Sequence, residues 1–288
     1  MLAELARYPH ATVTDVASVK VSVLNAVRAG GGDLTRYVGG HPMAGRERSG
    51  PGAARGDLFA ARPWVICPTP ESTDERLATV RRLAELLGAV PVSMSAQRHD
   101  EAVAVVSHLP QVAASLVAAR LTAVDDDVVA LAGGGLRDVT RIAASDPELW
   151  QQILTGNAAP LRGHLAAMRG ELDLAVAALD AVIAAGADAG SGALRELVAA
   201  GNVGQQRIPG KHGGTATTYA VVVVVVPDAP GSLARLFHDI GAAGINVEEL
   251  VLEHAPGRAV GLVEVSVVPS AREALVSALT SSGWILAG

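Results

Sequence analysis

The chain has 288 residues, a length that predicts two or three packed domains. Half of the residues are hydrophobic and 18% are charged, and this composition excludes an intrinsically disordered chain. The formal net charge of -6 argues against a nucleic-acid partner, because proteins of that kind present a basic face.

The chain holds one cysteine, Cys67, which excludes an internal disulfide and is typical of a reducing, cytoplasmic compartment. Cys67 lies in the apolar stretch Trp64–Pro68, which predicts a buried strand end and not a nucleophile. We find no run of about 18 apolar residues and no signal-peptide pattern, so we expect no membrane partner.

Residues 1–96 alternate between strand-like and helix-like segments. Strands are predicted over 11–15, 64–67 and 90–94, and helices over 19–29 and 71–87. This alternation is typical of a parallel α/β sheet.

From residue 97 to about residue 200 the strand signals vanish, and Ala-, Leu- and Val-rich segments with helical periodicity follow one another. We therefore predict an all-helical domain over 97–200. The segment 161–185 carries small apolar residues over much of its surface, which is typical of a helix that packs on other helices or on a second subunit. This pattern predicts a homodimer.

The composition of residues 201–214 predicts a linker, because glycine and polar residues dominate it. Over 215–288 the pattern predicts strand, helix, strand, strand, helix and strand, beginning with a strand over 217–226. That order is typical of a ferredoxin-like unit.

A polar cluster, Thr14–Lys20, lies where a predicted strand ends and a helix begins. Ligands of open α/β sheets bind at the carboxyl ends of the strands, so Asp15 and Ser18 are candidate ligand-binding residues. The alternative is that Asp15 or Ser18 caps the helix without touching a ligand. Position alone leaves both interpretations open.

His41 lies in a loop-like segment after two glycines, where backbone can approach a ligand closely. In the helical region, Arg137 and Arg141 are four residues apart and would share a helix face suited to carboxylates. A solvated arginine face is the alternative. His99 and His108 lack the spacing of metal ligands, so no metal is expected.

At these residues the sequence resembles the prephenate dehydrogenase family of tyrosine biosynthesis, over about residues 10–200. The segments that carry the resemblance are Thr14–Lys20, Gly40–Gly45, Ser107–Pro110, Thr140–Ala143 and Ser145–Pro147 with Trp150. Residues 217–288 resemble an ACT domain through Asp228–Leu233 and Gly244–Asn246.

The family resemblance implies oxidative decarboxylation of prephenate to 4-hydroxyphenylpyruvate with NAD, and NADP is not excluded. His41 would accept the proton of the ring hydroxyl, because an imidazole titrates near the working pH. Ser18 would hold His41 and the nicotinamide in register, with Asp15 also at the cofactor, and Arg141 would bind a substrate carboxylate.

Further residues match family positions that line or gate the substrate pocket: Glu47, His99, Trp150 and Arg137, the last where a lysine is frequent. Gln111 stands where the family often has a second histidine. The ACT resemblance implies feedback by an aromatic amino acid, with Asp228, Gly231 and Asn246 as its regulatory residues.

No G-x-G-x-x-G turn follows a strand in this sequence, although the family carries one before the segment that matches Thr14–Lys20. We therefore expect an N-terminally truncated, partial Rossmann-type parallel sheet (α/β), an all-helical dimerisation domain and a ferredoxin-like ACT domain. Two alternatives stay open. One is a non-catalytic dimer that binds aromatic metabolites, and the other is an arogenate dehydrogenase, a choice associated with the region of Arg46.

Overall fold

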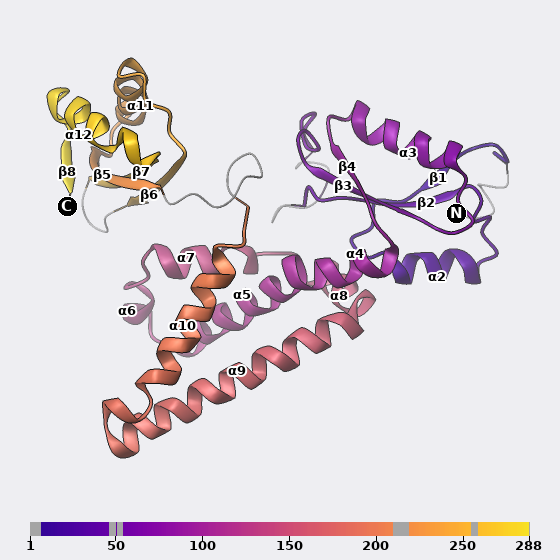
Figure 1. The fold of residues 1–288 in the computed structure, drawn as a ribbon, viewed down its shortest axis with the longest axis horizontal. Helices are drawn as coiled ribbons and strands as arrows, with labels where there is room; N and C mark the ends of the chain where they lie inside the picture. The colour runs from indigo at the N-terminus through magenta and orange to yellow at the C-terminus, as the bar shows by residue number, and fades with distance from the viewer. Residues whose placement is uncertain (1–6, 46–49, 51–53, 210–218, 255–258, 288) are drawn as a thin grey trace. The chain divides into compact units, whose positions relative to one another are not determined.

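The computed structural model describes residues 7–45, 50, 54–209, 219–254 and 259–287 (Figure 1). The chain forms two compact units, residues 1–173 and 174–288. Helix α9 (Ala158–Ala185) runs from the first unit into the second.

The first unit contains a four-stranded sheet in the order β1-β2-β3-β4. The strands are β1 (Val13–Thr14), β2 (Tyr37–Pro42), β3 (Pro63–Pro68) and β4 (Val90–Ser93). The pairs β1–β2 and β3–β4 are parallel, as predicted, whereas β2 and β3 are antiparallel. The expectation of a purely parallel sheet therefore needs this correction. No helix is described between β2 and β3, and a parallel return would need a crossover of that kind.

Helices cover both faces of this sheet because successive strand side chains point to opposite sides. Val38, Trp64 and Ile66 are buried with side chains of α3 (Asp74–Leu86). Tyr37, Val65 and Cys67 are buried on the opposite face with α2 (Val21–Ala29) and α4 (Ala96–Val103). Figure 1 shows α3 on one side of the strands and α2 and α4 on the other.

Cys67 lies inside β3 with 3% of its surface exposed, as the prediction of a buried strand position requires. Burial, with the nearby Asp100 and Asp15 carboxylates, raises the pKa of its thiol to about 12. A thiol in this state is a poor nucleophile, because the thiolate is the reactive form.

Between β4 and residue 205 the regular elements are all helices, as predicted for 97–200. After α4 come η2, a π-helix (Ala104–His108), α5 (Leu109–Arg120), η3 (Leu121–Ala123), α6 (Asp126–Val129), α7 (Gly134–Thr140), η4 (Arg141–Ala143), α8 (Pro147–Gly156) and α9. The π-helix interrupts what the sequence pattern presents as one helix. Such segments are frequent at functional sites.

One helical stretch, Ala96–Ala123, has an 18-residue window with a mean hydropathy of 1.6 and is long and apolar enough to cross a membrane. The expectation that no segment reaches this length was wrong, because counting uninterrupted apolar runs misses a stretch that a few polar residues divide. The same stretch carries His99, Asp100 and His108, which are buried and hydrogen-bonded within the first unit. The stretch Ala96–Ala123 therefore resembles a membrane span by its length and composition only.

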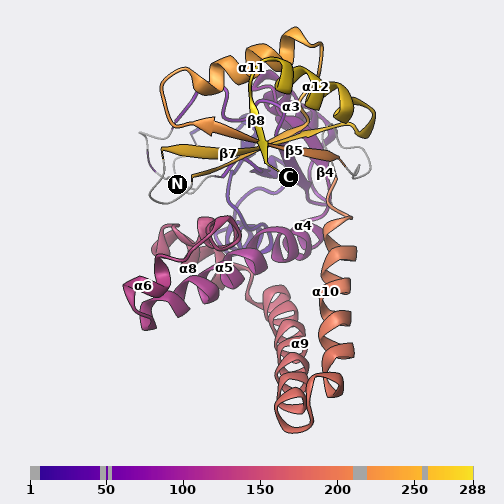
Figure 2. The same ribbon diagram turned by 90° about the vertical axis from the view of Figure 1, so that its left-hand side faces the viewer.

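The end of α9 forms a helical hairpin with α10 (Ser191–Gln205) through η5 (Ala187–Ala189), visible in both Figures 1 and 2. A Cβ at Gly190 would lie 2.1 Å from the carbonyl oxygen of Ala178, so this close approach requires glycine. Residues 201–205, predicted as linker, belong to α10. Residues 210–214 of that linker lie outside the described residues.

The rest of the second unit follows the predicted order: β5 (Ala220–Pro227), α11 (Ser232–Ala242), β6 (Glu249–His254), β7 (Val260–Val267), η7 (Pro269–Ala271), α12 (Arg272–Ser281) and β8 (Ile285–Ala287). Its sheet has the order β6-β7-β5-β8, with every pair antiparallel. Alternate valines of β5 are buried with leucine and isoleucine side chains of α11 and α12. The two helices therefore share one apolar core with the sheet.

Candidate functional site

A cavity of about 410 Å³ lies in the first unit, between the sheet and the helices that follow it. Ser18, which follows β1, and His41 of β2 line one part of it, and Arg141 of η4 and Trp150 of α8 line another. These four residues come from four separated parts of the sequence. The structure therefore brings together the predicted catalytic pair and two of the predicted substrate-binding residues.

The position of His41 depends on how closely β2 approaches the segment after β1. A Cβ at Gly40 would lie 2.6 Å from the carbonyl oxygen of Asp15, so this approach needs glycine before the histidine. The ammonium of Lys20, whose exposed fraction is 1%, donates to the Gly40 carbonyl oxygen at 2.5 Å and also to the Asp15 carboxylate. Lys20 thus ties the start of α2 to the backbone beside His41.

The Asp15 carboxylate is engaged within the protein. It accepts hydrogen bonds from Lys20, from the Tyr37 hydroxyl at 2.7 Å and from the Ala17 N–H at 2.9 Å. The structure gives Asp15 a structural role, in which its charge compensates buried Lys20, and its part in cofactor binding stays a prediction. The sequence did not show this because the partners Lys20 and Tyr37 meet Asp15 only in the folded chain.

His99 was expected in the substrate pocket, but it lies behind His41 and does not line the cavity. Its Nε2 is 2.8 Å from Nδ1 of His41, and its Nδ1 is 2.7 Å from Oδ1 of Asp100. Asp100 also accepts the backbone N–H groups of Lys20 and Val21 at 2.8 and 2.9 Å. A connected chain therefore runs from the N-terminus of α2 through Asp100 and His99 to His41.

Burial lowers the pKa of His41 to about 3, and the nearby His99 and Lys20 add to this effect. Burial alone would raise the pKa of Asp100, but the hydrogen bonds from His99, Val21 and Lys20 outweigh it and keep that pKa below its ordinary value. His41 is therefore a neutral imidazole and Asp100 a carboxylate at neutral pH. A neutral imidazole can accept a proton.

His108 is a site residue that the sequence reasoning left without a role. It ends the π-helix η2, is 1% exposed and lines the cavity. Its ring packs edge-on against the ring of Trp150, with 6.1 Å between the ring centroids. Its Nδ1 is 3.2 Å from Nδ2 of Asn157. The signal was present in the segment Ser107–Pro110, which carries part of the family resemblance.

Gln111 also lines the cavity and is 5% exposed. Its amide has contacts of 3.5 and 3.4 Å with the hydroxyls of Ser115 and Ser145, which are long for hydrogen bonds. The side chain therefore presents a neutral polar group where the family often has a second histidine.

The remaining predicted residues do not gather at the cavity. Arg137 of α7 is exposed and does not line it, whereas Arg141 lies in the following 3₁₀-helix η4 and does. Glu47 lies outside the described residues. Within the described residues no group of three or more His, Cys, Asp or Glu side chains could hold a metal ion.

The predicted regulatory residues occupy two places in the second unit. Asp228 follows β5 and Gly231, with φ of 87°, is the N-cap of α11, whereas Asn246 follows the other end of that helix. The 11 residues of α11 span about 16 Å at the rise of an α-helix. One copy of the chain therefore does not bring Asn246 together with the other two.

Two family descriptions match the first part of the chain. Residues 1–93 match the nucleotide-binding domain of prephenate dehydrogenase, and residues 95–185 match its dimerization domain. Among curated relatives, the probable prephenate dehydrogenase NovF of Streptomyces niveus is 38% identical over 277 residues, covering 94% of this chain and 76% of NovF.

Two solved structures are similar as well. Prephenate dehydrogenase from A. aeolicus in complex with hydroxyphenyl propionate and NAD+ shows 32% identity and a TM-score of 0.56 over 67% of this chain and 65% of that one. Synechocystis arogenate dehydrogenase shows 31% identity and a TM-score of 0.56, over 71% of this chain and 72% of that one.

A nucleotide-binding α/β region followed by a helical region, with a histidine and an arginine facing one cavity, defines a nucleotide-dependent dehydrogenase. The chain belongs to the prephenate dehydrogenase family, and the resemblance noted in the sequence is thereby confirmed.

Proposed function

We propose that this protein oxidises and decarboxylates prephenate to 4-hydroxyphenylpyruvate with NAD as the hydride acceptor. One observation carries the proposal: a single cavity is lined by the neutral base His41 and the cation Arg141. A similar structure, from A. aeolicus, is a complex with hydroxyphenyl propionate and NAD+. The domain assignment that goes with it is nucleotide binding over 1–96 and a helical substrate and dimerisation domain over 97–200.

The described residues fit the nicotinamide end of the cofactor. Ser18 is half-buried, lies at the carboxyl end of the parallel strand β1 and lines the same cavity as His41. Its hydroxyl can donate and accept, as a carboxamide requires. When bound, NAD supplies the acceptor for the hydride, and Ser18 would hold the nicotinamide beside His41. NADP would present the same ring and carboxamide.

The residues of the cavity divide the chemistry between them. His41 accepts the hydroxyl proton while the carbon that bears the hydroxyl loses a hydride, which leaves a carbonyl. The electron pair of the bond to the ring carboxylate then enters the ring as carbon dioxide leaves, and the ring becomes aromatic. His41 returns its proton to the new phenol oxygen. Arg141 binds a substrate carboxylate through charge-assisted hydrogen bonds and so sets the ring beside His41.

Arogenate is the second candidate substrate, because the Synechocystis relative is an arogenate dehydrogenase. Arogenate differs from prephenate by an amino group in place of the side-chain keto group. Gln111, a neutral amide in the cavity, can accept from an ammonium or donate to a carbonyl, so it suits either side chain. The same His41 and Arg141 chemistry serves both substrates, whereas a non-catalytic metabolite-binding dimer would not need the base.

The second unit fits regulation by a small molecule. Its βαββαβ order and antiparallel sheet support an ACT domain over 215–288. Asp228 and Gly231 precede α11 and Asn246 follows its other end, so an aromatic amino acid would bind between two copies of the chain. A homodimer, which the dimerization domain also favours, would supply that arrangement. A cytoplasmic location stays a prediction.

The proposal is tested by following NADH formation at 340 nm with prephenate and with arogenate. We expect turnover of prephenate, and we expect His41→Asn to lower kcat by about 10²–10⁴-fold, the usual contribution of a general base. Circular dichroism checks that the variant stays folded. Turnover of neither substrate by the folded full chain would contradict the proposal, and turnover of arogenate alone would replace the substrate.

A further inference from the structure

Two histidines line the cavity, and each is linked by its inner nitrogen to a different part of Asp100. The Asp100 carboxylate reaches His41 through His99. The Asp100 carbonyl oxygen reaches His108 through Asn157. The three linking residues are almost fully buried, with exposed fractions of 1% for His99 and 2% for Asp100 and Asn157. Buried groups must pair their donors with acceptors, which fixes where the protons lie.

The carboxylate branch begins at the N-terminus of α2. Asp100 accepts the N–H groups of Lys20 and Val21, and the positive end of the helix favours its ionised form. An ionised carboxylate can only accept, so the 2.7 Å contact requires a proton on Nδ1 of His99. A His99 ring that carries its single proton on Nδ1 has a lone pair on Nε2. With that lone pair as the acceptor, the 2.8 Å contact puts a proton on Nδ1 of His41.

The carbonyl branch leads to the opposite result. A backbone carbonyl can only accept, so the 2.7 Å contact with the Asp100 oxygen must come from the amide nitrogen of Asn157. The same nitrogen is 3.2 Å from Nδ1 of His108. Nδ1 of His108 is then an acceptor, and the proton of a neutral His108 lies on Nε2. Burial lowers the pKa of His108, which favours this neutral form.

We infer that Asp100 fixes the two cavity histidines in opposite tautomers, so that His41 presents a proton acceptor at Nε2 and His108 presents an N–H donor at Nε2. His99 and Asn157 are positioning residues that transmit this arrangement. His108 becomes a further binding residue, which donates to an oxygen of the substrate, carboxylate or carbonyl. The catalytic consequence rests on the proposed function, whereas the tautomers themselves do not.

The arrangement also stabilises the positive charge that His41 gains when it accepts a proton. When His41 accepts a proton at Nε2, its Nδ1–H still donates to His99, whose own Nδ1–H donates to Asp100. The carboxylate therefore stabilises the imidazolium through one intervening ring. This is the role that a buried carboxylate has beside a catalytic histidine in other enzymes.

The tautomers can be read directly from the full chain labelled with ¹⁵N-histidine, by long-range ¹H–¹⁵N correlation. The chain has eight histidines, and His41→Asn, His99→Gln and His108→Asn assign the three that matter. We expect Nδ1–H forms for His41 and His99 and an Nε2–H form for His108 at pH 7.5. An Nε2–H form of His41, or an Nδ1–H form of His108, would overturn the inference. No turnover is needed, so this result is independent of the proposed function.

Two variants separate the branches. Asp100→Asn removes the ionised acceptor but keeps the backbone carbonyl, so His99 and His41 should lose their single tautomers while His108 keeps its own. Asn157→Leu removes the donor to His108, so His108 should lose its single tautomer while His41 and His99 keep theirs. If both variants left all three histidines unchanged, Asp100 would be a helix cap and nothing more, and the inference would be wrong.

Kinetics supply the functional half of the test. Asp100→Asn should lower kcat for the active substrate by about 10³-fold, as expected when a base is held in the wrong tautomer. His99→Gln keeps an oxygen that can accept from His41 and should retain activity within about 10-fold, whereas His99→Leu should lose as much as Asp100→Asn. Equal losses in the glutamine and leucine variants would contradict the positioning role of His99.

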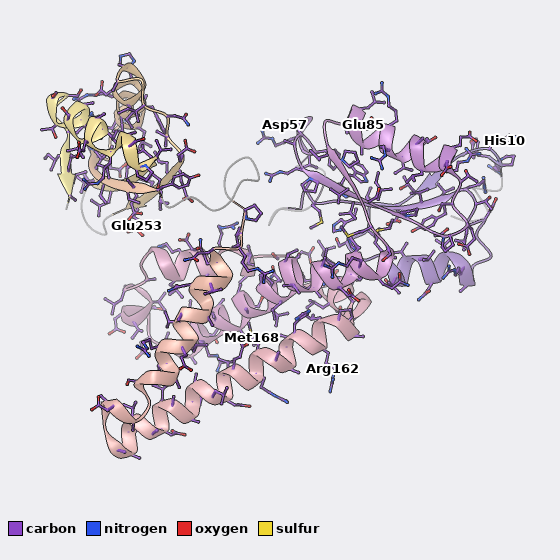
Figure 3. The ribbon with its side chains drawn as sticks, viewed as in Figure 1. His10, Asp57, Glu85, Arg162, Met168 and Glu253 are labelled. Carbon is purple, nitrogen blue, oxygen red and sulfur yellow. The ribbon has the colours of Figure 1, made fainter. Side chains whose placement is uncertain are left out.

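Matched controls exclude general effects of the substitutions. Ser95→Ala removes the side-chain cap of α4, the helix that carries His99 and Asp100, and should lower the thermal midpoint without changing tautomers or kcat. His10→Asn alters an exposed histidine at the surface of the first unit (Figure 3), and it should leave the thermal midpoint, the tautomers of the other histidines and kcat unchanged. If Ser95→Ala reproduced the Asp100→Asn spectrum, loss of helix stability would explain both, and the inference would fail.

Discussion

The two units bury different kinds of side chain. The described part of the first unit buries seven polar side chains. Thr69 pairs with Ser72, and the other six line the cavity or lie in the hydrogen-bonded groups beside it: Lys20, His99, Asp100, His108, Gln111 and Asn157. In the described part of the second unit the buried core is made of Val, Leu, Ile and Trp, and Ser266 is the only buried polar residue. Burying polar groups lowers stability unless they are paired, so the first unit keeps them for chemistry. The second unit must act through its surface.

The largest effect is expected from damage to the apolar core of the second unit. Leu236→Ala removes a fully buried side chain of α11 and should reduce stability by about 2–5 kcal/mol. Calorimetry should show an earlier transition for the second unit, with kcat unchanged below that temperature. Leu233→Ala, at a position that is 36% exposed on the same helix, is the control and should have a much smaller effect. If Leu236→Ala lowered kcat at temperatures below the transition of the second unit, catalysis would depend on both units and the comparison would be wrong.

A smaller effect is expected at the cavity wall of the first unit. Arg141→Gln should lower kcat/KM by about 10–100-fold, because hydrogen bonds to a charged group contribute about 1.5–3 kcal/mol. Arg137→Gln is the matched control, since Arg137 is exposed and does not line the cavity. Steady-state kinetics with prephenate and with arogenate measures both. Equal losses at the two positions would restore the sequence interpretation of a shared arginine face.

The last effect concerns the pH dependence of stability and is gradual. Burial lowers the pKa values of His41 and His108 from 6.5, so below pH 6.5 the unfolded chain binds protons that the folded first unit does not. Stability is therefore complete above pH 6.5 and falls by up to about 1.4 kcal/mol per pH unit for each histidine. Calorimetry between pH 7 and pH 5 should show the first transition falling more than the second. His41→Asn should reduce that difference, and parallel shifts of both transitions would contradict the prediction.

Much of the site could be predicted from the sequence because it depends on short segments at the ends of elements. His41, Ser18, Arg141 and Trp150 line the cavity as expected. His99 does not line the cavity as expected, because its ring is buried against His41, 58 positions away, and this contact leaves no mark in the local sequence. The role of Asn157 depends on a contact with a backbone oxygen 57 positions away, which no local pattern records.

The fold shows the same division between local and long-range information. The helices over 147–155 and 158–185 and the βαββαβ order follow from periodicity and turn residues, and the structure agrees. The antiparallel pairing of β2 with β3 depends on the path of the chain between them and was not predicted. The glycines of residues 201–205 favour a linker in the sequence, whereas the structure continues α10 through them with every side chain exposed.

The number of residues in the π-helix Ala104–His108 determines which side chains of the following helix α5 face the cavity. A π turn accommodates one more residue than an α turn, and each residue of an α-helix rotates the following side chains by about 100°. Deleting one residue here would restore a regular helix and turn Pro110 and Gln111 away from the cavity, with every core contact of α5 rotated as well. A substitution in this segment changes one side chain, whereas a change of a single residue in its length moves every side chain that follows it.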